Sequence, residues 1–177
     1  EIAHNKALIG IIVCALLFLL AQLSLSNMNN YIYPNYFGNV SAMSLANLAG
    51  MVVILVLSTF IVKLSAKVGK KELSVIGSII SAAAFLILFF IHTDNVWVWI
   101  VLVLISSVGT AMFNMVIWAM ITDVIDDSEV RTGVRQDGTI YSVYSFARKL
   151  GQACSSGISG VLLSIIGYTA ATAHDPK

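Results

Sequence analysis

Two adjacent cations, Arg148 and Lys149, lie within an apolar stretch that begins at Thr139. If this stretch is a helix that crosses a membrane, Lys149 lies about 15 Å from its start, near the middle of the bilayer. A charge at that depth costs about 2.5–3.5 kcal/mol on insertion scales, and it marks a substrate or ion pathway by default. Lys149 is too deep to reach the surface, whereas Arg148 can face the same pathway or extend toward the headgroups. The pair therefore predicts a polar binding site inside a membrane.

Further polar side chains recur at spacings of three and four around these cations, which is the spacing of one helix face. They are Tyr141, Tyr144, Ser145, Gln152, Ser155, Ser156 and Ser159. The tyrosines, Ser145 and Gln152 indicate a wet cavity in which a substrate or a coupling cation binds. The later serines are interleaved with glycines, and this pattern favours close packing against another helix.

The acidic residues are distributed differently, because none of the nine lies in the middle of an apolar stretch. A buried ammonium group requires a counter-charge. The partner of Lys149 is therefore expected from outside this chain, either as a carboxylate on a missing segment or subunit or as an anionic ligand.

Charged residues gather a second time between 123 and 138. Asp123, Asp126 and Glu129 are spaced by three, which puts them on one face at a helix end, and Arg135 and Asp137 follow. This pattern predicts ion pairs that hold a cytoplasmic gate closed. A solvated charged loop is the alternative interpretation.

A third polar group ends the first apolar stretch and contains Gln22, Ser26, Asn29, Asn30 and Tyr33. Amides, hydroxyls and aromatic rings suit a sugar, so Asn30 and Tyr33 are candidates for a sugar cavity. The alternative is an ordinary helix end at the membrane interface, where tyrosine is enriched.

The elements that position these residues must be apolar helices. Of the 177 residues, 58% are hydrophobic and 11% are charged, and the mean hydropathy is +0.90. These values exclude a soluble enzyme, a disordered tail and a nucleic-acid binder. We expect an all-α, multi-pass membrane protein, a polytopic helical bundle, in which Cys14 and Cys154 are buried like small hydrophobic residues. Five stretches are long enough to span a bilayer, at about 7–33, 42–64, 73–91, 96–122 and 139–166.

The basic residues predict the orientation of these spans in the cell membrane. If the spans alternate, one side carries Lys6, Lys63, Lys67, Lys70, Lys71, Arg131 and Arg135. Cytoplasmic loops are enriched in lysine and arginine. We therefore expect a cytoplasmic N-terminus and two cytoplasmic loops, 65–72 and 123–138.

The motifs of soluble catalysis are absent from the sequence. There is no nucleophile–base signature and no phosphate-binding loop, and His4, His92 and His174 lack the spacing of metal ligands. We expect no enzymatic activity, no cofactor and no metal site in this chain.

The segment from Thr122 to Tyr168 resembles the glycoside–pentoside–hexuronide:cation symporters, the melibiose permease-like family of the major facilitator superfamily. The strings that carry the resemblance are Asp123-Val-Ile-Asp126, Glu129, Arg131-Thr-Gly-Val-Arg135, Ile140-Tyr-Ser and Lys149-Leu-Gly-Gln152. The resemblance implies two six-helix halves, with this chain forming helices seven to eleven in the C-terminal half.

The resemblance also implies roles for individual residues. Lys149 matches a lysine close to the sugar and cation sites, and Tyr144 and Ser145 match positions that face the sugar cavity. The charges at 123–137 match a cluster that pairs with the first half in the outward-open state. Arg148 departs from the family, which usually has a neutral residue there. The family's coupling carboxylates lie in the first half, which this chain lacks.

Two functions fit these observations. The first is a secondary active transporter that carries a glycoside (galactoside, pentoside or glucuronide) together with sodium or a proton by alternating access. This chain would be a fragment of it that lacks the N-terminal six-helix half, and it would not transport alone. The second is a non-transporting five-helix membrane sensor or assembly subunit that docks a partner through the loop 123–138.

Overall fold

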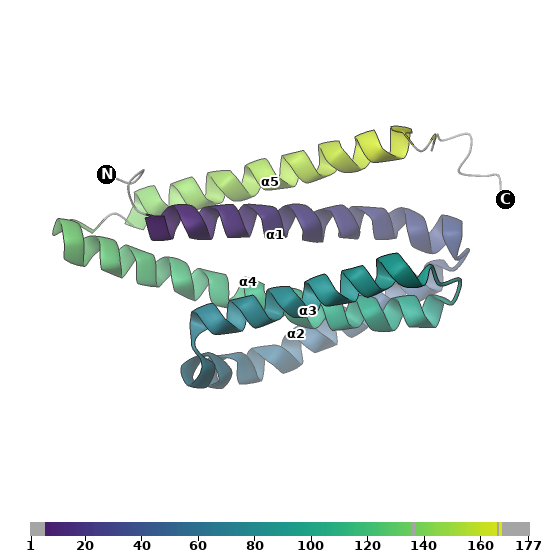
Figure 1. The fold of residues 1–177 in the computed structure, drawn as a ribbon, viewed down its shortest axis with the longest axis horizontal. Helices are drawn as coiled ribbons and strands as arrows, with labels where there is room; N and C mark the ends of the chain where they lie inside the picture. Colours follow the sequence, from purple (N-terminus) through teal and green to yellow (C-terminus); the bar gives the residue numbers. More distant parts are fainter. Residues whose placement is uncertain (1–5, 136, 166, 168–177) are drawn as a thin grey trace.

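The computed structural model describes residues 6–135, 137–165 and 167, and its side chains other than those of Lys6, Ala7 and Arg131. The described chain forms long helices joined by short turns. They are α1 (Lys6–Tyr31), the π-helical turn η2 (Ile32–Tyr36), α2 (Val40–Val68), α3 (Lys70–Ile91), α4 (Val96–Thr132) and α5 (Asp137–Ile165). Successive α-helices run in opposite directions, so the α2–α3 and α4–α5 turns lie at one end of the bundle (Figure 1). The all-α membrane fold predicted from the sequence is confirmed.

Four of the helices are long and apolar enough to cross a membrane, namely Leu8–Tyr36 with its π-helical turn, α2, α3 and the segment Val96–Val130. The fifth predicted span, 139–166, corresponds to α5, which has 29 residues. Its length is sufficient, but its polar side chains lower its hydropathy. Residue 166 lies outside the described residues.

The two segments predicted to be cytoplasmic loops, 65–72 and 123–138, are largely helical. Only Gly69 separates α2 from α3, where its φ of +104° favours glycine. In the segment 123–138, α4 continues to Thr132. Gly133, with a φ of +69° in the left-handed region, ends the helix. Helices of this chain thus extend past the apolar stretches, because their backbone hydrogen bonds do not depend on lipid.

Local sequence explains the other helix ends. Asn39 and Asn95 cap α2 and α4, accepting hydrogen bonds from the backbone N–H groups of Ala42 at 3.0 Å and Trp97 at 2.9 Å. Pro34 lies in η2, where its missing N–H interrupts the α-helical ladder, and a wider turn replaces it.

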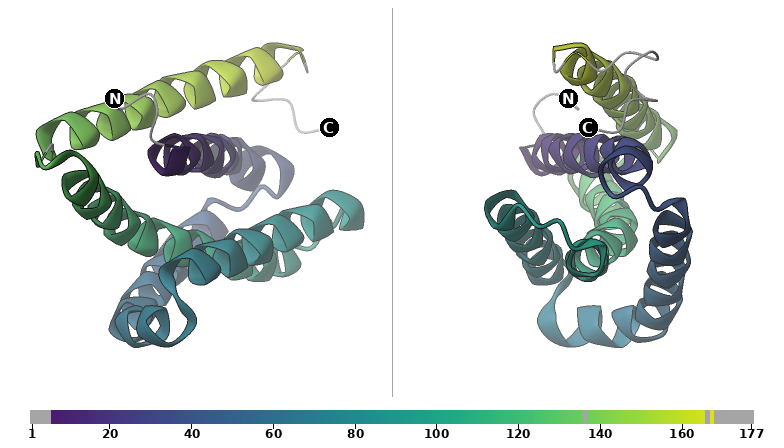
Figure 2. Two further views of the ribbon diagram at one scale, coloured as in Figure 1. Left: turned by 60° about the vertical axis from the view of Figure 1, so that its left-hand side comes forward. Right: turned by 90° about the vertical axis from the view of Figure 1, so that its right-hand side faces the viewer.

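The helices form two groups. In one, α2 and α3 pack on α4, and in the other α5 packs on α1 (Figure 2). The two groups meet where α1 touches α4, around the stacked rings of Phe18 and Phe113, whose centroids are 4.0 Å apart. α4 is the central helix. Of its most apolar 18-residue segment, 50% is buried inside the bundle, compared with 11% for the corresponding segment of α2. The remaining apolar surface of the bundle is exposed, as expected for contact with lipid.

Cys14 and Cys154 are exposed, so the prediction that they are buried is wrong.

Candidate functional site

The helix α5 carries the predicted binding residues and packs on α1 through a face of small side chains. This face consists of Ile140, Tyr144, Ala147, Gly151, Ser155 and Ser159. The hydroxyls of Ser24 and Ser155 are hydrogen-bonded at 3.1 Å, and the Asn27 side-chain amide donates to the Ser159 hydroxyl at 3.4 Å. The close packing predicted for these serines is confirmed, and the hydrogen bonds add specificity to it.

A second face of α5 is polar and exposed, which is unusual in an apolar bundle. It presents the side chains of Tyr141, Ser145, Lys149, Gln152 and Ser156, with Arg148 half-buried beside them. The third face, around Val143, Phe146 and Leu150, is apolar and exposed. Lipid can cover the apolar face, but the polar face requires water or another protein surface.

The predicted single stripe is therefore two faces, and Tyr144 belongs to the buried one. Its side chain is 1% exposed and lies in a core with Leu8, Ile121 and Ile140. Tyr144 and Ser145, both expected to face the sugar cavity, thus lie on different faces of α5. Adjacent helix positions diverge by about 100°, so only one of the two can face α1 while the other faces outward.

Arg148 is held by aromatic rings. Its guanidinium carbon lies 5.1 Å from the centroid of the Trp118 ring and 5.8 Å from that of Tyr144, both within the range of cation–π contacts. The Trp118 and Tyr144 rings are edge to face with centroids 5.2 Å apart. Arg148 thus stacks beside α4, within the bundle. No sequence pattern indicates Trp118, because only the packing of α4 near α5 brings it to this cation.

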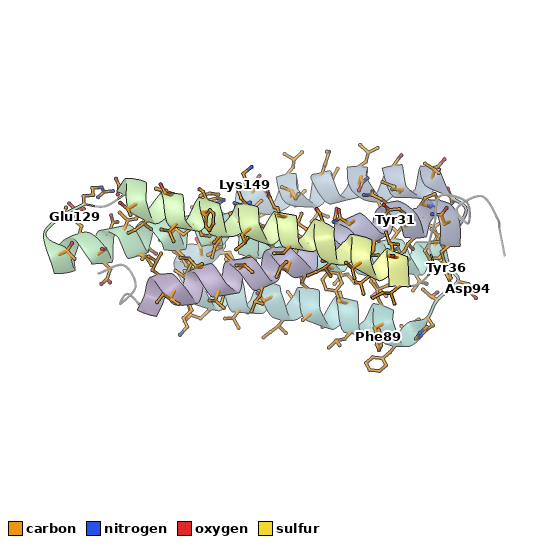
Figure 3. All side chains as sticks on the ribbon, turned by 90° about the horizontal axis from the view of Figure 1, so that it is seen from above. Tyr31, Tyr36, Phe89, Asp94, Glu129 and Lys149 are labelled. Carbon is orange, nitrogen blue, oxygen red and sulfur yellow. The ribbon has the colours of Figure 1, made fainter. Side chains whose placement is uncertain are left out.

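Lys149 lies about midway between the ends of the bundle. Figure 3 shows its side chain extending outward from α5, between Glu129 at one end and Asp94 at the other. Within the described part of the chain, no hydrogen bond or ion pair is found for its ammonium group. The counter-charge expected for Lys149 is thus not supplied by these residues.

The charged cluster lies at the end of the bundle that holds the α4–α5 turn. Arg135 donates hydrogen bonds to Asp137 at 2.8 Å, Glu129 at 2.7 Å and Asp126 at 3.3 Å. Hydrogen bonds to Asp137 and then Glu129 raise the pKa of Arg135 above its ordinary value, so it stays charged at every physiological pH.

Asp123 has a different partner within this half. Both of its oxygens accept hydrogen bonds from the Lys70 ammonium, at 2.6 and 2.7 Å, which ties the end of α4 to the start of α3. The side chains of this pair are 40% and 55% exposed, so the pair itself adds little stability. The predicted ion pairs therefore form inside this half of the bundle.

Asn30 and Tyr33 do not share a cavity. Tyr33 is 2% exposed and packs with Ala42, Ala46 and Ile100, because the π-helical turn directs it toward α2 and α4. In this half of the bundle, its ring is covered by these helices. Asn30 lines an open pocket of about 240 Å³ between α1 and α5, together with Asn27, Tyr31, Ser156, Ser159, Gly160 and Leu163.

The other amides of α1 connect helices. Asn114 donates to Gln22 at 3.1 Å, and the Trp99 indole donates to Asn29 at 3.3 Å, so both α1 residues bind α4. Their polarity is explained by helix packing.

Comparison with known proteins gives several relatives. The chain is 35% identical over 164 residues to the uncharacterized symporter YjmB of Bacillus subtilis (strain 168), covering 93% of this chain and 36% of that protein. It is 34% identical over 112 residues to the glucuronide carrier protein homolog of Escherichia coli (strain K12), covering 63% of this chain and 24% of that protein. It is 35% identical over 100 residues to a putative sulfoquinovose importer of Salmonella typhimurium, covering 56% of this chain and 21% of that protein.

The chain thus spans about a third or less of the length of these relatives. No solved structure matches it significantly. The family of MFS/sugar transport proteins matches it over residues 1–177. The resemblance to glycoside–pentoside–hexuronide:cation symporters is confirmed, and this chain belongs to the family of MFS/sugar transport proteins.

Proposed function

We propose that this chain forms most of the second half of a secondary active transporter that carries a glycoside together with sodium or a proton. The observation that carries the proposal is the exposed polar face of α5, which bears Lys149 in the middle of an otherwise apolar exterior. Such a face is stable in a membrane only beside water or another protein surface. A first half of six helices, packed across an aqueous pathway, would supply both.

The substrate class is proposed from the printed names of the relatives. One is a glucuronide carrier protein homolog and another a putative sulfoquinovose importer. Both names denote sugars with an acidic group. The polar face of α5 and the pocket beside Asn30 offer hydroxyl and amide groups that suit sugar hydroxyls. The coupling carboxylates would come from the first half, since no acid lies mid-span here.

The charged cluster suits a gate between the halves. Three carboxylates, those of Asp126, Glu129 and Asp137, surround the single guanidinium of Arg135. The excess negative charge would attract basic residues of the first half. Binding of sugar and cation would then favour the conformation in which these pairs separate, opening the cytoplasmic side. The N-terminus and this cluster are proposed to be cytoplasmic, because the basic residues lie at this end.

The test is uptake by the full-length protein in proteoliposomes. We expect an inward sodium or proton gradient to drive accumulation of a glucuronide, a xyloside or a galactoside against its own gradient. The control is the same vesicles with the gradient collapsed by an ionophore. Absence of gradient-driven uptake of all three sugars would refute the proposal.

Thiol labelling distinguishes the transporter from the five-helix sensor, whose α5 would pack dry against a partner. We expect a hydrophilic thiol reagent to label polar-face cysteines at least about tenfold faster than lipid-face ones, because reaction requires a hydrated thiolate. The exposed Cys14 and Cys154 are first replaced by serine. The polar-face variants are Tyr141→Cys, Ser145→Cys and Gln152→Cys. The matched lipid-face variants are Val143→Cys, Phe146→Cys and Leu150→Cys. Equal, slow labelling of both sets would favour the sensor.

A further inference from the structure

We infer that Arg148, held by Trp118 and Tyr144, binds the acidic group of the substrate and thereby selects anionic over neutral glycosides. The inference rests on the proposed transport function and assigns its specificity to one side chain. The neighbouring Lys149 keeps its proposed role in coupling sugar transport to the cation.

The guanidinium of Arg148 is fixed in position by its surroundings. Its central carbon lies 5.1 Å from the centroid of the Trp118 ring and 5.8 Å from that of the Tyr144 ring. Tyr144 is itself 1% exposed, and the Trp118 ring also stacks on Tyr141 with centroids 6.3 Å apart. Because both rings are held by their own contacts, the planar fork of Arg148 has little freedom. A preorganised guanidinium loses less entropy on binding an oxyanion than a flexible lysine does.

Among the residues that the structure describes, no carboxylate pairs with the guanidinium of Arg148. Cation–π contacts use the face of the guanidinium, whereas its N–H donors lie along the edge. The neighbouring acids have other partners, since Asp123 pairs with Lys70, and Asp126 and Asp137 pair with Arg135. Asp137 is also eleven residues away along α5, about 16 Å. Beyond its hydrogen bond to the Tyr144 side chain, the guanidinium therefore has remaining N–H donors to which an incoming anion can bind.

The form of the donor set indicates which anion fits. Arginine presents parallel N–H groups that match two oxygens of a planar carboxylate, or of a sulfonate, bidentately. On the same exposed face, Tyr141, Ser145 and Gln152 offer hydroxyl and amide groups for the sugar ring. A glycoside with an acidic substituent would bind both the Arg148 donors and these polar groups. A neutral glycoside would leave the Arg148 donors without an anion.

The test compares three substrates of the full-length protein in proteoliposomes. Methyl glucuronide, methyl sulfoquinovoside and methyl glucoside differ only in the group on one ring carbon, which is a carboxylate, a sulfomethyl group or a hydroxymethyl group, respectively. We expect Arg148→Gln to raise KM for the two acids by about 10- to 100-fold, as for loss of a hydrogen bond to a charged group, and to change KM for the glucoside less than twofold. Lys67→Gln, which removes an exposed charge at the end of α2, is the matched control and should leave all three values unchanged.

Each outcome decides the question. A wild-type protein that takes up neither acid overturns this inference alone, and one that also takes up no glucoside, xyloside or galactoside refutes the transport function as well. Uptake with an unchanged acid-to-glucoside KM ratio in Arg148→Gln overturns the inference alone and leaves the transport function standing. If Arg148→Gln does not reach the membrane, the same KM values are measured for Arg148→Lys instead. Because it keeps the charge but loses the fork, it should raise KM for the acids several-fold with the glucoside unaffected, and an unchanged ratio overturns the inference.

Discussion

Replacement of Lys149 by alanine in the full-length protein is expected to reduce gradient-driven uptake by about 100-fold. Lys149 is exposed midway along α5, and its ammonium has no partner among the described residues. In the proposed transporter, its ammonium would bind the substrate or a carboxylate of the first half. A hydrogen bond to a charged group contributes up to about 3 kcal/mol, and 1.4 kcal/mol corresponds to a factor of ten. Initial rates of uptake with and without the driving gradient measure the effect.

Two controls separate coupling from folding. Lys67→Ala removes an exposed lysine from the last turn of α2 and should leave uptake unchanged. Lys149→Arg keeps the charge with a different geometry and should retain part of the activity. Wild-type uptake by Lys149→Ala would show that the lysine is only tolerated in the bundle and takes no part in transport.

The sequence was sufficient to predict the helices, because hydropathy and helix length are set by the membrane. It was insufficient to place their ends. α4 continues through Asp123 and Glu129 to Thr132, since charged side chains are compatible with a helix once it leaves the hydrocarbon. The spacing of three between these charges indicates a helix face, and α4 does continue through it.

The residues of the candidate site were likewise predictable only in part. Spacing along α5 identified the polar residues, but it could not tell which of them face α1, because that depends on where the neighbouring helix lies. Tyr144 lies on the polar face by spacing alone, but the neighbouring helices bury it. The contact of Arg148 with Trp118 joins residues thirty positions apart and arises only from the packing of α5 near α4. Periodicity within one helix carries no information about such contacts.

The α3–α4 interface depends on two glycines that no polar pattern indicated. A Cβ atom at Gly109 would lie 2.2 Å from the carbonyl oxygen of Gly77 and 2.9 Å from the backbone nitrogen of Ser81. A Cβ at Gly77 would in turn lie 2.7 Å from the Gly109 carbonyl oxygen. The backbones are thus in direct contact, and the Ser81 hydroxyl donates across the interface to the Ser106 carbonyl at 2.8 Å. Close approach of this kind favours helix association in lipid through van der Waals packing.

Gly109→Leu is therefore expected to lower the free energy of unfolding of the full-length protein by about 3 kcal/mol, the upper range for overpacked cores. The atoms that its side chain meets belong to the backbone of α3, which cannot move aside without separating α3 from α4 and breaking the Ser81 hydrogen bond. Thermal unfolding in detergent micelles measures the loss. Gly50→Leu in α2 is the matched control, because a Cβ there meets nothing within 4 Å, and it should leave the midpoint nearly unchanged. Equal midpoints for the two variants would contradict the backbone contact between α3 and α4.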